Sequence, residues 1–325
     1  MGLKKRIGAM LLAGTVTIGC MAGCGNGSGN SAQGSASNGS GKTYKIGCSV
    51  DELTPFMTLC VNGAQKFADE HDDVELTIVS ANSDLTTQLN NVEDFVSGGY
   101  DAVIIKPYDS EGCAPISASC TAAGIPLVSF NNNMTAECNS YVGSNHKYSG
   151  ELEAKMVAEK LGGKGKVVVL QGTMSHQAAI DRWEGLQEVL AEYPDIEIVD
   201  AQDADWLRDS ALTKTEDWLN AGIKFDAIIA NCAEMAVGAV LALKDAGYKP
   251  GEIVVGSIDG LQESLELLKE GWICCDIYQP AAGQGYAAME AAYKLLHGES
   301  VEDYIDVPYE EIDENNVDEY LALYK

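Results

Sequence analysis

The feature that most constrains the fold is a repeated alternation of short apolar runs with longer amphipathic stretches, which begins at Tyr44 and continues almost to the C-terminus. The runs are continuously apolar and rich in Val and Ile, which is typical of parallel strands covered by helices on both faces. We expect strands at Tyr44–Val50, Val74–Val79, Ala102–Ile105, Pro126–Phe130, Val167–Leu170, Ile196–Val199, Ala227–Ile229, Ile253–Val255 and Trp272–Tyr278. We expect helices at Phe56–Glu70, Leu85–Val96, Leu152–Leu161, Gln177–Glu192, Glu234–Ala246 and Gly283–Leu296. The pattern predicts an α/β protein with doubly wound parallel sheets.

An internal echo divides this pattern into two similar lobes. The segment Tyr100–Ile105 is matched by Phe225–Ile229 about 125 residues later, and each follows a helix that ends in glycine. Each is then followed by a helix that closes on an Ala-Gly pair. This spacing is far too long for a solenoid repeat, so it predicts two lobes of similar α/β topology within one chain.

The ends of the predicted strands nominate site residues, because ligands of open α/β sheets bind beyond the carboxyl ends of the strands. All but one of the side chains that follow these strands are polar, where a loop would as readily hold Gly or Pro. They are Lys106, Asn131, Asn132, Asn231, Cys232 and Asp259.

The composition excludes two classes of partner. The net charge of −28 repels nucleic acid and anionic lipid surfaces, so neither is expected to bind. The motifs Gly-x-Ser-x-Gly and His-Glu-x-x-His are missing and only four histidines occur, so we expect no enzymatic activity, no cofactor and no metal. Eight cysteines follow the N-terminal region without metal-ligand spacing. Buried free thiols are the preferred interpretation, and disulfides are the alternative.

The N-terminus carries an export signal. A basic segment at Lys4–Arg6 precedes about a dozen apolar residues, too few to span a bilayer as a helix. The following Met21-Ala22-Gly23-Cys24 resembles a bacterial lipoprotein signal, which implies a lipid on Cys24, with Cys20 as the alternative and an ordinary secretory cleavage site as another. We therefore expect a signal peptide at residues 1–23 and a flexible Gly/Ser-rich tether at residues 24–43.

From Tyr44 to about Ile312 the chain resembles the ribose- and galactose-type sugar-binding proteins of bacterial ABC importers. The resemblance rests on these stretches: Thr54–Met57, Asn62–Lys66, Ile105–Ser110, Leu170–Gly172, Ala178–Gly185, Glu234–Ala239 and Val254–Gly260. It implies a type I periplasmic-binding-protein fold, in which the two lobes are joined by a hinge of three crossings. The implied boundaries are residues 44–144 plus 280–306 for lobe one and residues 145–279 plus 307–325 for lobe two.

The resemblance also implies the binding site. Phe56 and Met57 would cover one face of a sugar ring, and Trp206 would cover the other. Arg182 would bind ring oxygens with its planar guanidinium, although an ion pair with Asp181 or Glu184 is the alternative. The complete implied set is Phe56, Met57, Lys106, Asn131, Asn132, Arg182, Trp206, Cys232, Asp259 and Gln279.

The sequence departs from the ribose pattern at several of these positions. Asn131 and Asn132 replace an Asp-Arg pair, Lys106 replaces an asparagine, and Cys232 replaces an asparagine or aspartate. These changes disfavour ribose itself and leave another pentose, a hexose, a polyol or a furanose signal open. The resemblance thus implies a monomeric, lipid-anchored protein outside the cytoplasm that delivers a sugar-like ligand to an ABC permease. The alternative is presentation of the ligand to a membrane sensor.

Overall fold

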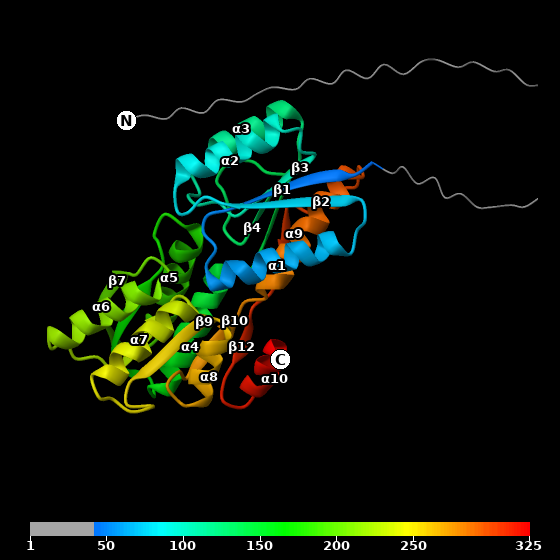
Figure 1. The fold of residues 1–325 in the computed structure, drawn as a ribbon. Coiled ribbons are helices and arrows are strands. Elements are labelled where there is room, and N and C mark those ends of the chain that lie inside the picture. The colour runs from blue at the N-terminus through cyan, green and yellow to red at the C-terminus, as the bar shows by residue number, and fades with distance from the viewer. Residues whose placement is uncertain (1–41) are drawn as a thin grey trace, which may run out of the picture. The chain divides into compact units, whose positions relative to one another are not determined.

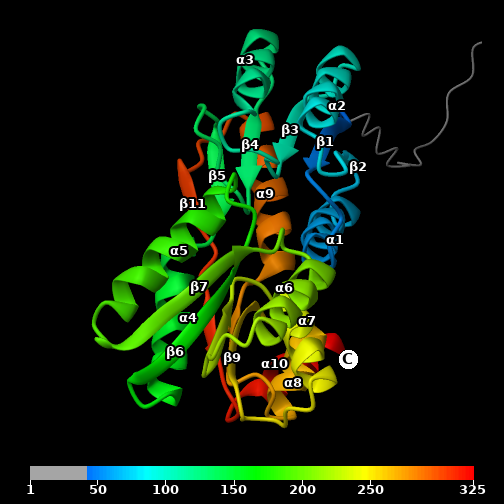
Figure 2. The same ribbon diagram turned by 90° about the vertical axis from the view of Figure 1, so that its left-hand side faces the viewer.

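The computed structural model describes residues 42–325. The predicted signal peptide, Cys20, Cys24 and all but the last two residues of the predicted tether therefore lie outside the described residues. Residues 42–325 form two six-stranded sheets, each covered by helices on both faces (Figures 1 and 2). The predicted fold class, two doubly wound α/β lobes, is confirmed.

The first lobe contains the sheet with strand order β11-β5-β4-β3-β1-β2, in which all neighbouring strands are parallel. Its strands are β1 (Tyr44–Val50), β2 (Val74–Ser80), β3 (Ala102–Ile105), β4 (Leu127–Phe130), β5 (Ser140–Gly143) and β11 (Tyr304–Asp306). Its helices are α1 (Pro55–Asp69), α2 (Leu85–Ser97), α3 (Ala114–Ala123) and α9 (Ala281–Leu296). Alternate residues of β3 face opposite sides, so Ile104 packs with α1 and α9 while Val103 and Ile105 pack with α2 and α3.

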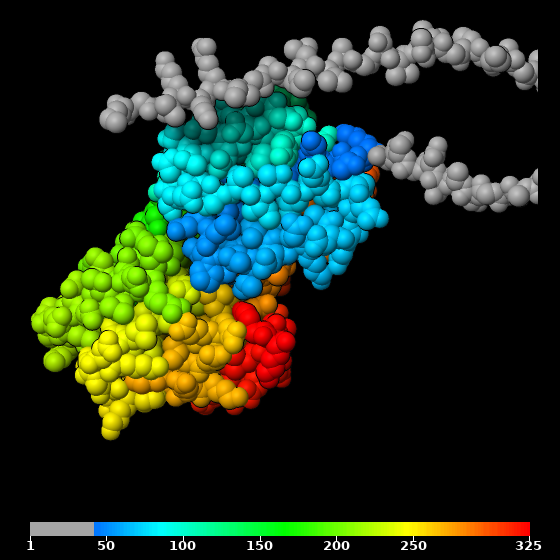
Figure 3. All heavy atoms as spheres, in the orientation of Figure 1, coloured from blue at the N-terminus to red at the C-terminus, as the bar shows by residue number. Residues whose placement is uncertain are grey.

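The second lobe contains the sheet with strand order β12-β10-β9-β8-β6-β7, in which only the pair of β12 with β10 is antiparallel. Its strands are β6 (Lys164–Gln171), β7 (Asp195–Asp203), β8 (Ala227–Ala230), β9 (Val254–Asp259), β10 (Cys275–Tyr278) and β12 (Glu310–Ile312). Its helices are α4 (His146–Lys160), α5 (Gln177–Leu190), α6 (Arg208–Asn220), α7 (Ala233–Asp245), α8 (Gln262–Lys269) and α10 (Val317–Leu321), with a 3-10 turn at Ala322–Tyr324. The C-terminal residues, red in Figure 3, lie beside the orange residues of α8, where Lys269 and Asp318 form an ion pair at 2.5 Å.

The chain crosses between the lobes three times. It leaves the first lobe between β5 and α4, returns between β10 and α9, and leaves again between β11 and β12. The strands that flank these crossings are short and polar in part, and the sequence pattern did not reveal β5, β11 or β12. The predicted strand at Trp272–Tyr278 was also too long, because β10 begins only at Cys275, after the turn at Gly271, whose φ is 83°.

The cysteines differ in part from the expected burial. All eight in the described residues carry free thiols, and six of them are buried. Cys138 and Cys274 are partly exposed. Four of the eight lie in strands or helices, namely Cys48, Cys60, Cys120 and Cys275, and the other four lie in connecting segments.

Close contact between α4 and α5 fixes the position of the helix that carries Arg182. A side chain at Gly150 would collide with the carbonyl group of Arg182, and one at Gly185 would collide with the carbonyl group of Lys147. Glycine at both positions lets the two backbones approach directly. The backbone of Arg182 is therefore part of the helix contact itself.

Candidate ligand-binding site

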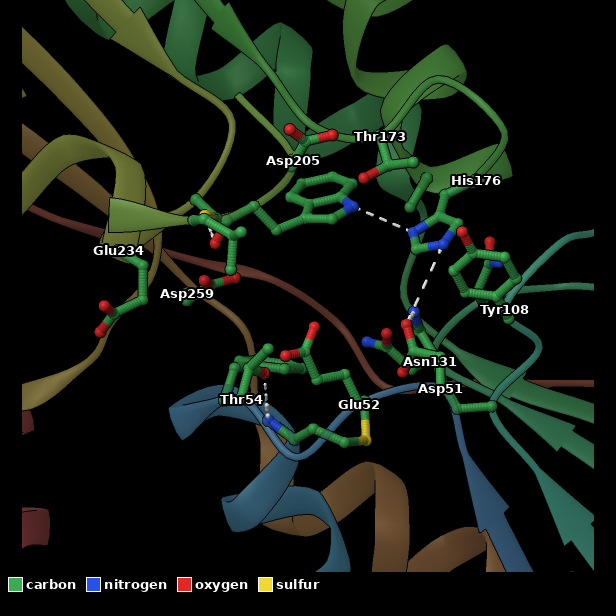
Figure 4. A pocket seen from close by; sticks show the side chains of 18 of the residues that line it. Asp51, Glu52, Thr54, Tyr108, Asn131, Thr173, His176, Asp205, Glu234 and Asp259 are labelled. Carbon is green, nitrogen blue, oxygen red and sulfur yellow. Dashed lines mark hydrogen bonds and ion pairs between the residues drawn. The ribbon is translucent and has the colours of Figure 1, made fainter. Parts of the chain in front are cut away.

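A cavity of about 320 Å³ is lined by residues that follow the strands of both sheets. It includes all ten residues nominated by the sequence: Phe56, Met57, Lys106, Asn131, Asn132, Arg182, Trp206, Cys232, Asp259 and Gln279. The other lining residues, several of them labelled in Figure 4, are Asp51, Glu52, Thr54, Ser83, Tyr108, His146, Thr173, His176, Ala178, Asp205, Leu207 and Glu234. The strand-end rule therefore located one shared cavity, and Asn231 is the strand-end residue that does not line it.

Apolar side chains from both lobes border the cavity. Phe56 and Met57 lie in the first turn of α1, which Thr54 caps by accepting a hydrogen bond from the backbone N–H of Met57 at 3.1 Å. Met57 is only 3% exposed and belongs mainly to the core of the first lobe. On the other lobe, Trp206 has a φ of 63°, and its indole packs where any side chain at Gly172 would collide with it. The close contact with Gly172 therefore fixes the position of the Trp206 indole.

Arg182 is bound mainly by the protein itself. It is 3% exposed, and its Nε donates to Ser149 at 3.3 Å while Nη1 donates to the carbonyl oxygen of Asn231. Its Nη2 donates to Gln279 Oε1 at 3.1 Å and to the Tyr309 hydroxyl at 2.8 Å. A guanidinium has five N–H bonds, and four of them are used here, so one N–H of Arg182 has no protein partner and is the one that a ligand could accept from.

The alternative ion pairs for this arginine do not form. Asp181 accepts a hydrogen bond from Gln177 at 2.7 Å, and Glu184 binds Lys147 at 3.0 Å. Burial opposes the charge of Arg182, but Tyr309 and Asp259 favour it, and the pKa of the guanidinium stays above its ordinary value. Arg182 is thus a buried cation.

Asp259 lies at the end of β9 in a strained backbone conformation. Its φ is 117°, a region that residues other than glycine rarely adopt. Its carboxylate accepts a hydrogen bond from the backbone N–H of Ala233 at 3.2 Å and lies 4.0 Å from Arg182 Nη2. Burial raises the pKa of Asp259 to about 7, although Arg182 favours the charged form. This carboxyl group therefore binds its proton much more tightly than an exposed aspartate does.

Lys106 forms a buried ion pair with Asp51. Lys106 follows β3 and Asp51 follows β1, and both side chains are largely buried. Because parallel strands end at the same edge of the sheet, these two charges meet although 55 residues separate them. The lysine is consequently neutralised within the protein.

His176 lines the cavity and has a ring N–H without a protein partner. Burial, followed by the charge of Lys106, lowers the pKa of His176 to about 2, so its ring is neutral at physiological pH. Trp206 Nε1 donates to His176 Nδ1 at 2.9 Å, which leaves the ring proton on Nε2. Nε2 has no hydrogen-bond partner and lies 4.0 Å from the Asp51 carboxylate (Figure 4).

Two further buried side chains have an unpaired polar atom at the cavity. Asn132 Nδ2 donates to the carbonyl oxygen of Pro107 at 3.1 Å, but its Oδ1 has no partner. Gln279 Oε1 accepts from Arg182, but its Nε2 has no partner. With His176 they provide one acceptor and two donors, and buried polar atoms without partners are uncommon in proteins. All three residues line the cavity, although these atoms themselves are buried from solvent in the arrangement described.

Charge at the cavity is predominantly negative. Its lining includes two cations and five carboxyl groups, namely Asp51, Glu52, Asp205, Glu234 and Asp259. Glu52 accepts a hydrogen bond from Ser83 at 2.8 Å and points its carboxylate into the cavity (Figure 4). Glu234 is held by Arg208 at 3.0 Å. Neither cation of the lining is free of a neighbouring carboxylate, so the site is unsuited to an anionic ligand.

Cys232 contributes a weakly polar wall. It is 5% exposed, and burial raises the pKa of its thiol well above the ordinary value. Its Sγ lies 3.8 Å from the carbonyl oxygen of Trp206. A neutral thiol is only a weak hydrogen-bonding group, so Cys232 presents a small and mainly apolar surface to the cavity.

Sequence reasoning missed His146, His176 and Asp51. His176 follows β6 and Asp51 follows β1, so the strand-end rule contained the signal for both. His146 gave no such signal, because it begins α4 after a crossing. In residues 42–325, no cluster of three or more metal-ligating side chains occurs. No helix of that part of the chain is long and apolar enough to cross a bilayer.

Comparisons with known proteins agree with this geometry. Residues 48–300 match the family described as "Periplasmic binding protein domain". A Rhizobium meliloti protein named for rhizopine binding is 38% identical, with coverage of 82% of this chain and 88% of its own. The xylitol-binding protein of Mycolicibacterium smegmatis is 34% identical, with coverage of 93% and 83%. An ABC transporter solute-binding protein of Bacillus halodurans, solved with bound myo-inositol, is 34% identical with a TM-score of 0.84, with coverage of 87% and 99%. The chain belongs to the periplasmic binding proteins.

Proposed function

We propose that this chain captures a neutral monosaccharide or polyol outside the cytoplasm and passes it to an ABC importer. One observation carries the proposal: the cavity shared by the two lobes is lined by the apolar side chains of Phe56 and Trp206 and by Asn132, His176 and Gln279, each of which has a buried polar atom without a protein partner. A sugar or polyol has the matching chemistry, with C–H faces and hydroxyl groups that both donate and accept. The relatives that bind xylitol and myo-inositol support this ligand class.

Size and charge narrow the ligand further. A volume of about 320 Å³ is near the lower end of the range for small-molecule pockets, roughly 300–1,000 Å³. The surplus of carboxyl groups disfavours sugar acids and sugar phosphates. A neutral ligand with about the size of a single ring fits both constraints.

Ligand capture is proposed to work as a clamp. The first lobe, residues 44–144 plus 280–306, contributes Phe56 and Asn132, and the second lobe, residues 145–279 plus 307–325, contributes Arg182 and Trp206. A ligand that contacts both lobes binds a closed arrangement better than an open one and so shifts the population toward closure. The permease would then recognise the closed form.

The chain is proposed to act as a monomer that a lipid on Cys24 holds at the outer face of the cell membrane. Residues 24–43 would form the tether, and a flexible Gly/Ser-rich coil of this length spans about 25 Å on average. That reach would let the binding lobes meet a permease in the same membrane.

Calorimetric titration tests the binding part of the proposal. We expect myo-inositol, xylitol or D-allose to give saturable binding and glucuronate to give none, and we expect small-angle scattering to show compaction on binding. Binding of glucuronate in preference to all neutral probes would contradict the proposed ligand class. Tight binding without compaction would contradict the clamp.

Uptake measurements test the transport part. Cells that lack the gene should lose uptake of the radiolabelled ligand, and a plasmid copy should restore it. Unchanged uptake, with the loss of a transcriptional response to the ligand, would instead assign the protein to a membrane sensor.

A further inference from the structure

Buried polar side chains form an unbroken hydrogen-bonded chain between the two lobes. Arg182 Nη2 donates to the Tyr309 hydroxyl at 2.8 Å, and the same hydroxyl lies 2.8 Å from His146 Nδ1. The other ring nitrogen of His146, Nε2, lies 2.6 Å from the carbonyl oxygen of Asn131. Arg182 belongs to α5 of the second lobe, whereas Asn131 follows β4 of the first. The chain therefore joins two residues that line the cavity from opposite lobes.

Each contact in this chain has a single direction. Burial, followed by the charge of Arg182, lowers the pKa of His146 to about 3, so the ring is neutral. A carbonyl oxygen only accepts hydrogen bonds, so His146 Nε2 must donate to Asn131 and Nδ1 must accept from Tyr309. The Tyr309 oxygen in turn accepts from Arg182. Removal of one member therefore leaves its buried neighbours without partners, which is costly.

The chain lies at the crossings between the lobes. His146 is the first residue of α4, directly after the first crossing, and Tyr309 lies in the third crossing, between β11 and β12. A second set of bonds starts from the side chain of Asn131, which donates to Gln284 Oε1 at 3.0 Å. Gln284 Nε2 donates to Ser144 Oγ at 2.8 Å, and Ser144 lies in the first crossing. Gln284 itself belongs to α9, which follows the second crossing.

The backbone of Asn131 depends on this network. Its φ is 62°, a left-handed conformation that asparagine adopts more readily than most other residues with a side chain. Its carbonyl oxygen accepts from His146 and also from the Tyr141 hydroxyl at 3.0 Å. Two donors thus hold the peptide that directs Asn131 and Asn132 to the cavity.

We propose that Tyr309 and His146 are positioning residues that hold Arg182 and Asn131 in their binding geometry and couple occupancy of the cavity to bending at the crossings. This inference rests on the proposed function, because it assumes that a ligand engages Arg182 and the loop at Asn131. A ligand bound to both ends of the chain would stabilise the arrangement in which every link is made. In a protein that lacks these hydrogen bonds, ligand contacts with Arg182 and Asn131 would no longer be transmitted to the crossings, so ligand binding would favour closure less strongly.

Hydroxyl removal in Tyr309→Phe tests the coupling. The probe is whichever of myo-inositol, xylitol and D-allose binds wild-type protein most tightly. We expect affinity to fall by about tenfold or more, as for the loss of a buried hydrogen bond to a charged group. We also expect a shifted interlobe distance distribution in the ligand-free protein. The distance labels, one per lobe, need a chemistry that avoids cysteine, since the described residues include eight free thiols.

Two sets of variants make the test specific. Tyr293→Phe removes a hydroxyl of the first lobe that binds Asp73 at 3.1 Å, and it should keep wild-type affinity and distances. His146→Gln retains an N–H donor near the position of Nε2, so it should lose less affinity than His146→Ala.

The outcomes separate coupling from simple stability. If Tyr309→Phe lowers the melting temperature but keeps wild-type affinity and interlobe distances, the residue is structural only and the inference is wrong. Equal losses in His146→Gln and His146→Ala would also overturn it. If no probe binds wild-type protein, the proposed ligand class fails, while the distances of the ligand-free variants still decide whether the chain controls the crossings.

Discussion

Asp259→Asn should remove one component of stability that falls as the pH rises in the ligand-free protein. Burial raises the pKa of Asp259 to about 7 from an ordinary value of 3.8, so the folded protein binds this proton more tightly than the unfolded chain does. The stabilisation from the bound proton is complete below the unfolded pKa and disappears as the pH rises through the folded pKa. A shift of this size is worth about 3 kcal/mol of unfolding free energy between pH 5 and pH 8.

Urea unfolding of wild-type and variant protein at several pH values between these limits measures the effect. Other buried groups titrate in the same window: burial raises the pKa of Asp276 to about 6, which removes stability as the pH rises, and it lowers the pKa values of His146 and His176 to about 3 and 2, which adds stability as the pH rises. The difference between wild type and Asp259→Asn isolates the one carboxyl group. Asp195→Asn, at an exposed position of β7, is the matched control and should run parallel to wild type. Parallel curves for Asp259→Asn and wild type would refute a buried, proton-binding carboxyl group at this position.

Three other predictions concern the cavity wall at Trp206, the contact between α4 and α5 at Gly185, and the lipid anchor at Cys24. Trp206→Ala should weaken ligand binding by about 1–3 kcal/mol in calorimetry, the value of burying such a side chain, and unchanged affinity would assign Trp206 to the scaffold alone. Gly185→Ala should destabilise the protein by about 1–3 kcal/mol in urea unfolding through the collision between α4 and α5. Gly283→Ala is its control, since a side chain there meets atoms only at 3.5 Å or more, and equal effects would argue against the collision. Cys24→Ser should release the protein from the membrane fraction, whereas release by Cys20→Ser with retention of Cys24→Ser would identify the other cysteine as the anchor.

The sequence sufficed for much of the fold because long buried elements leave strong patterns. The apolar run Val167–Leu170 and the amphipathic stretch of α5 are set largely by their own residues. The strands β5, β11 and β12 contain only three or four residues, and each mixes polar or glycine residues with apolar ones. The four-residue strands β3 and β8 are as short but continuously apolar, which is the local pattern that β5, β11 and β12 lack.

The residues that line the cavity could be predicted because they follow strands with strong apolar patterns. The ion pairs and hydrogen bonds among these residues could not be predicted. The strand-end rule nominates Lys106, but it does not reveal that Asp51 neutralises it. Likewise, the sequence suggests Arg182 as a ligand contact, yet its protein partners Tyr309 and Gln279 lie 127 and 97 residues away. Pairings of this kind depend on how two lobes and three crossings come together.

The bonding of Arg182 has a consequence for how ligand preference can diverge among related proteins. Four of its five N–H bonds are engaged inside the protein, so its replacement would disturb both the helix contact and the crossings. Asn132, His176 and Gln279 each make one structural hydrogen bond, to Pro107, Trp206 and Arg182 respectively, and leave another polar atom unpaired. Substitutions that keep the structural bond and change the unpaired end of the side chain can therefore retarget the cavity to a different pattern of hydroxyl groups while the core is preserved. A sensor engineered from this scaffold would best keep the arginine and vary the other three.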